Sequence, residues 1–368
     1  MAATAALLAL SGAGLAQATP AEPQPVIGTT PDGLTYMQIT QSDAEVRSHW
    51  TPERIASALA NPLPSPDITD ASIRKAHETA GSAGNGRTAK SLAPLSADAV
   101  APLRLQKTAT PASLAAAGAG PTIGDTSHSE LASNIPTWQT AIAGKLLFYT
   151  SDGRQGSCTA AAIVAPNKNS VWTAGHCLHQ GKGGTFYKNF IFIPGYDHKA
   201  IYGWWVLGKV IVSSDWANDS DSTWGDMGGG IANPSADYGN LQDWIGAYGY
   251  RFNGDTDFSG VTSLGYPVDA YNRSGADVHD GEQMMYCHGN VTDAGNWNPL
   301  DDRLQMNCDM GHGSSGGPIV TDLGGNSQII GTNSHRHADS NGNWTDNYLF
   351  SSNHGSDAAG VINWLNTH

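Results

Sequence analysis

Positive charge is scarce in this chain of 368 residues. It has 19 lysines and arginines against 33 aspartates and glutamates, which gives a formal net charge of −14. A surface of this sign repels phosphate groups, so the composition argues against nucleic acid or an anionic membrane as a partner. No apolar stretch reaches the roughly 18–20 residues that cross a bilayer. We therefore expect a protein with no nucleic-acid partner and no place in the membrane.

Aromatic residues are almost missing from the first third. Only two of 30, Tyr36 and Trp50, lie before residue 131, where 12 of the 19 prolines are found. Such a segment cannot build much of a core. An apolar run followed by a small-x-small sequence predicts a secretory signal peptide over residues 1–18. We expect residues 19–130 to be a propeptide and linker, and 131–368 to be the functional domain.

Cysteine is rare as well: there are four, all after residue 130. An even number in a secreted chain predicts two disulfides, and the sequence alone allows three pairings. A metal site is the alternative, and its ligands would be His176, Cys177, His179, Cys287 and His288. These residues lack C-x-x-C spacing, and a metal site would occupy His176, which is a candidate catalytic residue. We therefore expect no metal and no cofactor.

The most informative stretch is Gly313-Ser314-Ser315-Gly316-Gly317-Pro318. A serine between glycines on a tight turn can expose its hydroxyl beside backbone N–H groups, which is the geometry of acyl transfer. Upstream, His176 lies in a turn of small residues beside Cys177, and Asp226 lies between the two motifs. In chain order, the candidates are His176, Asp226 and Ser315.

Chain order decides between two readings of the serine motif. Gly-x-Ser-x-Gly also fits the nucleophile elbow of α/β-hydrolases, in which the acid and the histidine follow the serine. Only 53 residues follow Ser315, too few for the rest of that fold. The order His, Asp, Ser is that of the two-barrel serine proteases.

With these motifs the chain resembles the secreted bacterial chymotrypsin-like (trypsin-like) serine proteases. In style it is closest to the V8 and glutamyl endopeptidase branch and its actinobacterial trypsin-like relatives. The resemblance covers about residues 140–368. It is carried by Ser157-Cys158-Thr159-Ala160, Trp172-Thr173-Ala174-Gly175-His176-Cys177, Gly265-Tyr266-Pro267, the stretch from Cys308 to Pro318, and Gly331-Thr332-Asn333-Ser334.

The resemblance implies an all-β fold of two six-stranded antiparallel β-barrels, with the active site in the cleft between them. Short β-type runs separated by turn residues agree with this. We expect the first barrel at about 140–235, the second at about 240–350, and a closing C-terminal helix at 357–366. The expected strands are 143–149, 158–164, 170–173, 190–194, 204–212, 227–232, 241–250, 261–266, 283–287, 303–307, 318–321, 328–333 and 347–350. The propeptide should contain helices near 51–60 and 65–80.

The resemblance also assigns roles. Ser315 would be the nucleophile, His176 its general base, and Asp226 the carboxylate that orients the imidazole. The backbone N–H groups of Gly313 and Ser315 would form the oxyanion hole. The alternative candidates for the triad carboxylate are Asp215, Asp219 and Asp221, whose spacing is more typical of a solvent-exposed acidic turn. Cys158 would pair with Cys177, which leaves Cys287 with Cys308.

The specificity pocket should be lined by Asp309, Met310, Asn333, Ser334 and His335. Glutamyl enzymes use a threonine and a histidine where this chain has Met310 and Asn333, so a preference for glutamate is not implied. Ser334 should support the Asp226 carboxylate. Ser314 replaces the aspartate with which digestive relatives capture a new N-terminus, so activation must differ from theirs.

The sequence thus predicts a secreted, monomeric serine endopeptidase, made as a zymogen and acting on proteins or peptides. Two alternatives stay open: a catalytically inactive, protease-like binding module, and an esterase that uses the same triad.

Overall fold

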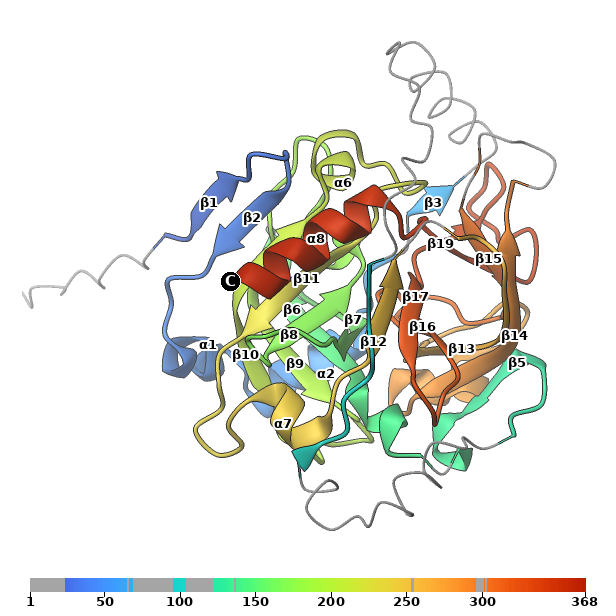
Figure 1. The fold of residues 1–368 in the computed structure, drawn as a ribbon, viewed down its shortest axis with the longest axis horizontal. Helices are drawn as coiled ribbons and strands as arrows, with labels where there is room; N and C mark the ends of the chain where they lie inside the picture. The colour runs from blue at the N-terminus through green and yellow to red at the C-terminus, as the bar shows by residue number, and fades with distance from the viewer. Residues whose placement is uncertain are drawn as a thin grey trace, which may run out of the picture.

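The computed structural model describes residues 24–64, 66–68, 95–103, 122–135, 137–252, 255–295, 301 and 303–368. The predicted signal peptide lies outside these residues, as does most of the helix predicted at 65–80. Two β-sheets lie beside each other, with helix α8 (Ser356–Thr367) packed across the first (Figure 1). The fold is therefore all-β with a C-terminal helix, as predicted.

The first half forms a closed barrel of six strands. They are β6 (Ala143–Tyr149), β7 (Gln155–Ala162), β8 (Ser170–Thr173), β9 (Lys188–Pro194), β10 (Trp205–Val212) and β11 (Gly228–Ala232). The strands pair in the order β9-β6-β7-β8-β11-β10, and a further pairing of β10 with β9 closes the circle. The interior is filled by apolar side chains such as Leu146, Phe192 and Val210, none of which is exposed.

The second half contains β12 (Gly249–Phe252), β13 (Phe258–Gly265), β14 (Met285–Asp293), β15 (Leu304–Asn307), β16 (Pro318–Thr321), β17 (Gln328–Thr332) and β19 (Tyr348–Ser351). Six of them pair in the order β19-β15-β14-β13-β16-β17. A bridge between His335 and Phe350 joins the chain after β17 back to β19, so these six strands return on themselves. Two barrels were predicted, and two are present.

One predicted strand is wrong. Residues 241–250 were expected to be extended, but they form helix α7 (Leu241–Ile245) and only the start of β12. The apolar residues Leu241, Trp244 and Ile245 are spaced by three and one, which is a helical pattern. The C-terminal helix α8 is confirmed, and its Leu365 packs directly against Gly229 of β11. The remaining short helices are α6 (Ser214–Asp219), η1 (Ala132–Asn134), η2 (Trp138–Ile142), η3 (Gly175–Cys177) and η4 (Gly275–Gly281).

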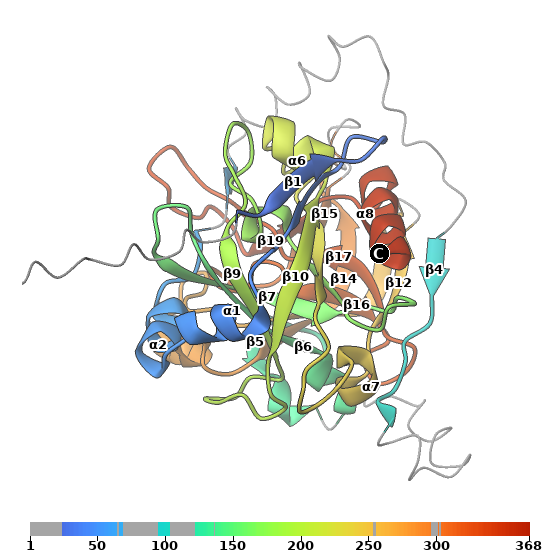
Figure 2. The same cartoon turned by 90° about the vertical axis from the view of Figure 1, so that its left-hand side faces the viewer.

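The N-terminal segment forms an extra layer on the first barrel. Hairpin β1 (Val26–Thr29) and β2 (Thr35–Gln38) extends the sheet, because β2 pairs with the edge of β10 (Figure 2). Helices α1 (Asp43–His49) and α2 (Pro52–Ala60) follow, and α2 confirms the helix predicted at 51–60. Trp50 between them is buried, stacks edge-on against Tyr149, and donates from Nε1 to the Asn189 carbonyl at 2.8 Å.

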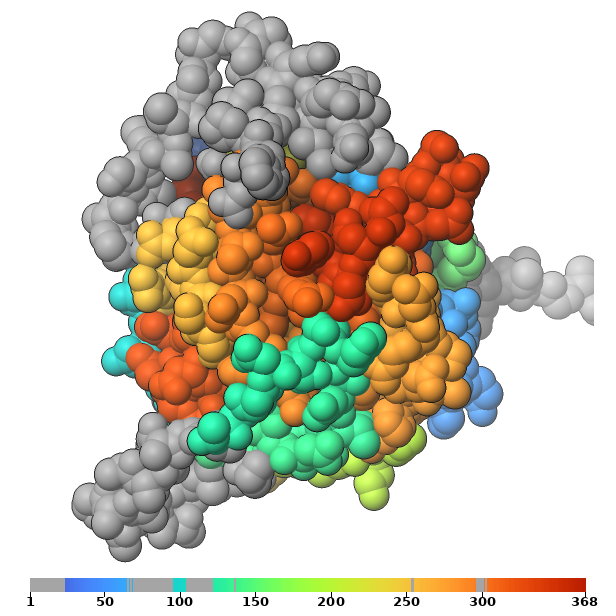
Figure 3. All heavy atoms as spheres, turned by 90° about the vertical axis from the view of Figure 1, so that its right-hand side faces the viewer, coloured from blue at the N-terminus to red at the C-terminus, as the bar shows by residue number. Residues whose placement is uncertain are grey.

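Three short strands add to the second half. β3 (Asp67–Ile68) pairs with β18 (Arg336–His337), and β4 (Leu95–Ala97) pairs with β12. β5 (Thr126–Leu131) pairs with β14, and it lies along the outer face of the second half (Figure 3, green on orange). The sheet of the second barrel thus takes in residues on the N-terminal side of 131. No helix among the described ranges is both long and apolar enough to cross a membrane.

Candidate active site

His176 is held in the short helix η3, directly after β8. The disulfide between Cys158 and Cys177 ties this turn to β7, with the two Cα atoms 6.1 Å apart. Trp216 packs edge-on against the imidazole ring at 6.0 Å. The turn is therefore fixed by a covalent link on one side and by aromatic packing on the other.

Asp226 lies two residues before the start of β11 and faces His176. Its Oδ1 accepts the backbone N–H of His176 at 2.8 Å, and its Oδ2 lies 2.8 Å from His176 Nδ1. Asp226 is 1% exposed and His176 is 4% exposed. Burial alone would raise the pKa of Asp226, but the charge of His176 and hydrogen bonds from His176 and Ser334 outweigh it and lower the pKa. The carboxylate is thus ionised at neutral pH.

The arrangement fixes the proton on the imidazole. An ionised carboxylate only accepts hydrogen bonds, so His176 must donate from Nδ1. In the neutral ring, Nε2 then carries the lone pair. His176 Nε2 is buried and has no hydrogen-bond partner within the described parts of the chain. This nitrogen is therefore available to accept a proton.

The turn that carries Ser315 packs against the histidine turn. Gly313 and Gly316 have φ of +89° and +81°, which side chains rarely adopt. A Cβ on Gly316 would collide with Thr173 Oγ1 and the Thr159 carbonyl. The Ser315 carbonyl accepts the N–H of Thr159 at 2.7 Å. The glycines thus allow the serine turn to reach strands β7 and β8, beside the segment that leads to His176.

The rival acids are used elsewhere. The carboxylate of Asp221 accepts the backbone N–H groups of Thr223 and Trp224 at 2.8 and 3.3 Å. The Asp219 side chain is exposed and lies 3.7 Å from Lys182. Asp215 is buried in α6. Asp226, in contrast, hydrogen-bonds both the backbone and the imidazole of His176.

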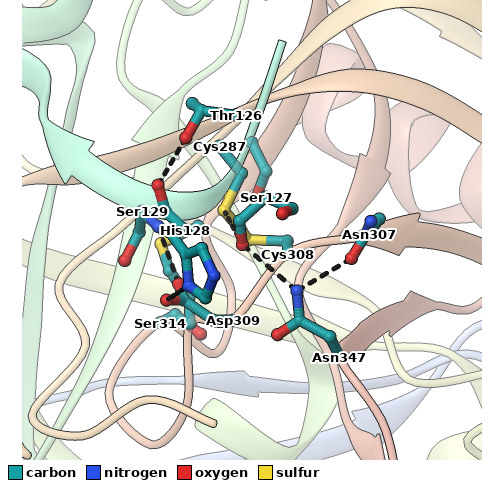
Figure 4. Close-up of a disulfide and its surroundings, with 12 residues drawn as sticks. Thr126, Ser127, His128, Ser129, Cys287, Asn307, Cys308, Asp309, Ser314 and Asn347 are labelled. Atoms are coloured by element: carbon teal, nitrogen blue, oxygen red, sulfur yellow. Dashed lines mark hydrogen bonds and ion pairs between the residues drawn. A yellow bond between two sulfur atoms is a disulfide. The ribbon is translucent and has the colours of Figure 1, made fainter. Parts of the chain in front are cut away.

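Asp309 was predicted to line the pocket, but its carboxylate is already occupied. It accepts from the Ser129 backbone N–H at 2.8 Å, and His128 Nδ1 lies 3.3 Å away (Figure 4). It also accepts from Arg273 Nη1 at 2.7 Å. The disulfide between Cys287 and Cys308, also as predicted, lies directly beside it. A carboxylate with three partners, one of them an arginine, does not attract a lysine or arginine of a substrate.

Other predicted pocket residues are also engaged. The Asn333 side chain donates to the Leu264 carbonyl at 3.0 Å and accepts from Ser263 Oγ at 2.7 Å. Met310 is buried, and its carbonyl accepts from the guanidinium of Arg336 at 3.1 Å. The same guanidinium donates to the Cys308 carbonyl at 2.7 Å. Arg336 therefore links the two segments that were predicted to form the pocket walls.

Ser334 contacts Asp226, as predicted: its Oγ donates to Asp226 Oδ2. His335 does not line an open pocket. It is fully buried and lies between Ser334 and Arg303, which contacts His335 Nε2 through Nη1 at 2.8 Å. Arg303 was not predicted, because nothing in the local sequence pattern links it to residues more than 30 positions away.

The alternative metal set is ruled out by the disulfides. Cys177 and Cys287 belong to different disulfides, so neither can supply a thiolate ligand.

The N-terminal segment passes close to these residues. The backbone of Asn61 and Leu63 exchanges hydrogen bonds with Ser157, at 3.3 and 3.1 Å. A Cβ on Gly313 would lie 3.5 Å from Pro62 Cβ. Farther on, β3 pairs with β18 in the other barrel, and the Ala338 N–H donates to the Ile68 carbonyl at 3.2 Å. The segment thus extends from one barrel to the other, past the predicted oxyanion hole.

No family model and no curated protein matches the chain. Solved structures do match it. A thermostable serine protease, AL20, from an extremophilic microorganism is 29% identical with a TM-score of 0.53, over 62% of this chain and 99% of AL20. Protease Anisep from Arthrobacter nicotinovorans is 27% identical with a TM-score of 0.54, over 62% of this chain and 97% of Anisep.

A Glu endopeptidase, solved in complex with MPD, is 18% identical with a TM-score of 0.49, over 68% of this chain and 100% of that protein. The matches to AL20 and Anisep, both named as proteases, agree with the two-barrel fold described above. The chain has the fold of the chymotrypsin-like serine proteases, the family that its sequence motifs resemble.

Proposed function

We propose that this protein is a secreted serine endopeptidase that cleaves peptide bonds through an acyl-enzyme intermediate. The observation that carries the proposal is the pairing of His176 with Asp226, which leaves a buried Nε2 ready to accept a proton. A buried polar atom without a hydrogen-bond partner costs stability. A binding module would gain nothing in return for that cost, whereas a protease uses the unpaired nitrogen as its base. The likeness to AL20 and Anisep, which are named as proteases, supports the same reaction class.

In the proposed mechanism, His176 Nε2 takes the proton of the Ser315 hydroxyl as its oxygen attacks the scissile carbonyl. The backbone N–H groups of Gly313 and Ser315 stabilise the resulting oxyanion. His176 then gives the proton to the leaving amine, and the peptide bond breaks. Water then attacks the acyl-enzyme in the same way, with His176 again acting first as base and then as acid, and Ser315 is released. Asp226 stays ionised and stabilises the imidazolium that forms in each half-reaction.

Proposed substrates are proteins or peptides, cut by a monomeric enzyme outside the cell. Two disulfides suit an oxidising compartment and support secretion. The occupied Asp309 argues against a preference for lysine or arginine before the cut.

We further propose that the chain is a zymogen whose residues 61–68 block the cleft. Ser315 and His176 are 1% and 4% exposed, too little for a peptide to reach them. The segment pairs in parallel with Ser157 on one barrel and with β18 on the other. A substrate that pairs with either edge would have to displace it.

The blocking segment is a poor substrate by composition. In Asn61-Pro62-Leu63-Pro64-Ser65-Pro66-Asp67, every peptide bond has a proline on one side. The pyrrolidine ring hinders attack and prolyl nitrogen lacks an N–H, while prolines favour an extended chain and lower the entropy cost of binding. Activation would then be a cut between residues 68 and 95, because β4 and β5 both pair with strands of the second sheet and must stay.

Labelling of Ser315 by a small fluorophosphonate tests the zymogen proposal. The full chain should react at least 100-fold more slowly than the processed enzyme. Ile68→Asp, which places a charge at a buried position, should speed labelling of the full chain, whereas Ile27→Asp at an exposed position should not. Equal labelling rates for the full and processed chains would refute it.

Casein cleavage separates the endopeptidase from the two alternatives. The processed enzyme should both take the phosphonate label and degrade casein. An inactive binding module takes no label, and an esterase takes the label but leaves casein whole.

A further inference from the structure

Behind Asp226 lies a buried row of polar side chains that the mechanism above does not use. Ser334 Oγ contacts Asp226 Oδ2 and also lies 2.8 Å from His335 Nδ1. His335 Nε2 lies 2.8 Å from Arg303 Nη1. Arg303 is held by Asp301, whose two carboxylate oxygens accept from Nε at 2.8 Å and from Nη2 at 2.7 Å. All five side chains are buried.

The outer end of the row fixes the proton on His335. A guanidinium has five N–H donors and no acceptor. The contact with Arg303 is therefore a hydrogen bond only if His335 Nε2 carries a lone pair. A neutral His335 must then carry its proton on Nδ1.

The inner end leads to the same result independently. Asp226 is ionised and only accepts, so the single hydroxyl proton of Ser334 points to Asp226. Ser334 Oγ can then only accept from His335, which requires a proton on Nδ1. Burial, and next to it the charge of Arg303, lowers the pKa of His335 well below its ordinary value, so the ring stays neutral.

We propose that His335 and Arg303 are positioning residues for catalysis, a role that rests on the proposed function. Every proton in the row points the same way: from Arg303 to His335, from His335 to Ser334, and from Ser334 to Asp226. Ser334 cannot rotate away, because His335 offers it a donor and no acceptor. Asp226 is thereby held between Ser334 on one side and His176 on the other, in the orientation that keeps the His176 proton on Nδ1.

The arrangement also explains why an arginine is tolerated in this interior. The bidentate contact with Asp301 balances its charge, and its remaining Nη2 contact reaches His337 Nε2 at 3.2 Å. The guanidinium stacks over Phe350, with 4.8 Å to the ring centroid. Each polar neighbour of Arg303 accepts a hydrogen bond from the guanidinium. The direction in which the hydrogen bonds of the row point is therefore set by Arg303, at the outer end.

Nitrogen-15 NMR of the histidine rings in the full-length chain tests the row directly. The expected result is a neutral His335 with its proton on Nδ1 throughout pH 5–8. A proton on Nε2, or a doubly protonated ring in this range, would overturn the proposal. This measurement does not depend on activity, so it can fail while the proposed function stands, and the reverse also holds.

Two substitutions test the effect on catalysis. His335→Asn keeps an N–H donor near the position of Nδ1, whereas His335→Gln keeps only a group near Nε2. In the processed enzyme, kcat should stay within about threefold for Asn and fall about tenfold for Gln, with KM unchanged in both. A tenfold loss is the rate equivalent of one displaced hydrogen bond of roughly 1.4 kcal/mol.

The matched controls are the same two substitutions at His198, whose side chain is exposed, and both should leave kcat unchanged. Equal kcat for His335→Asn and His335→Gln would overturn the proposal, as would a loss that appears only in KM. If either variant fails to fold, the NMR measurement on the unaltered chain decides.

Discussion

Replacing Asp226 with asparagine should reverse the proton on His176 without changing the shape of the site. The backbone N–H of His176 donates to Oδ1 at 2.8 Å and can do nothing else. We expect the asparagine oxygen to occupy this place, because the backbone N–H is fixed, whereas an NH₂ group at the place of Oδ2 gives up the hydrogen bond from the Ser334 hydroxyl. Its NH₂ group then takes the place of Oδ2, opposite His176 Nδ1.

The amide now donates to Nδ1, so the imidazole proton moves to Nε2. A ring in this tautomer cannot accept the proton of Ser315. In the Ser-His-Asp triad of chymotrypsin-like proteases the same substitution lowers kcat about 10⁴-fold, which corresponds to roughly 5.4 kcal/mol of transition-state stabilisation. We expect a loss of this order in kcat for Asp226→Asn, measured with a peptide substrate on the processed enzyme.

Asp219→Asn is the matched control, because Asp219 is exposed and lies in the neighbouring loop. It should retain wild-type kcat. A loss below tenfold for Asp226→Asn, with the fold intact by circular dichroism, would refute the role given to this carboxylate. An equal loss in the Asp219 variant would also do so.

Three further predictions concern stability, each measured by chemical unfolding. Burial lowers the pKa of Lys145 to about 8, and its ammonium has no hydrogen-bond partner among the described residues. Between pH 8 and about 10.5 this lysine is therefore protonated in the unfolded chain but largely neutral in the folded one. Lys145→Met should raise the free energy of unfolding by roughly 2–3 kcal/mol at pH 7, and this gain should shrink as the pH rises through that range. An unchanged gain at pH 10 would contradict this. Replacing Cys287 and Cys308 together by alanine removes a disulfide between residues with a sequence separation of 21 and should lower the free energy of unfolding by about 3 kcal/mol. A loss near zero would contradict this prediction. Gly316→Ala combines a positive φ with a steric collision and should cost about 3 kcal/mol or more, whereas Gly239→Ala has a similar φ in open space and should cost about 1 kcal/mol; equal costs would show that packing at residue 316 is unimportant.

The catalytic motifs and most strands could be predicted because their signals are local. Turn residues bracket strands such as β6, β8 and β16, and the predicted bounds agree with the structure. The helix at Leu241–Ile245 was not predicted, because a short apolar run fits both the helical and the strand period.

Contacts between distant segments could not be predicted in this way. Residues 24–60 add the hairpin of β1 and β2 to the sheet of the first barrel because the edge of β10 is open to them, and no local sequence pattern indicates an open edge. His335 contacts Arg303, which lies 32 residues away in the sequence and is itself held by Asp301, so this row of buried hydrogen bonds left no signature in the sequence.

The most direct test of the central claim identifies the atom that performs the attack. The processed enzyme is treated with a fluorophosphonate, digested, and the modified residue is located by mass spectrometry. We expect one adduct, on Ser315, formed in step with the loss of casein cleavage and absent from Ser315→Ala, which should also be inactive. An adduct on another residue, or casein cleavage that survives complete modification of Ser315, would contradict it.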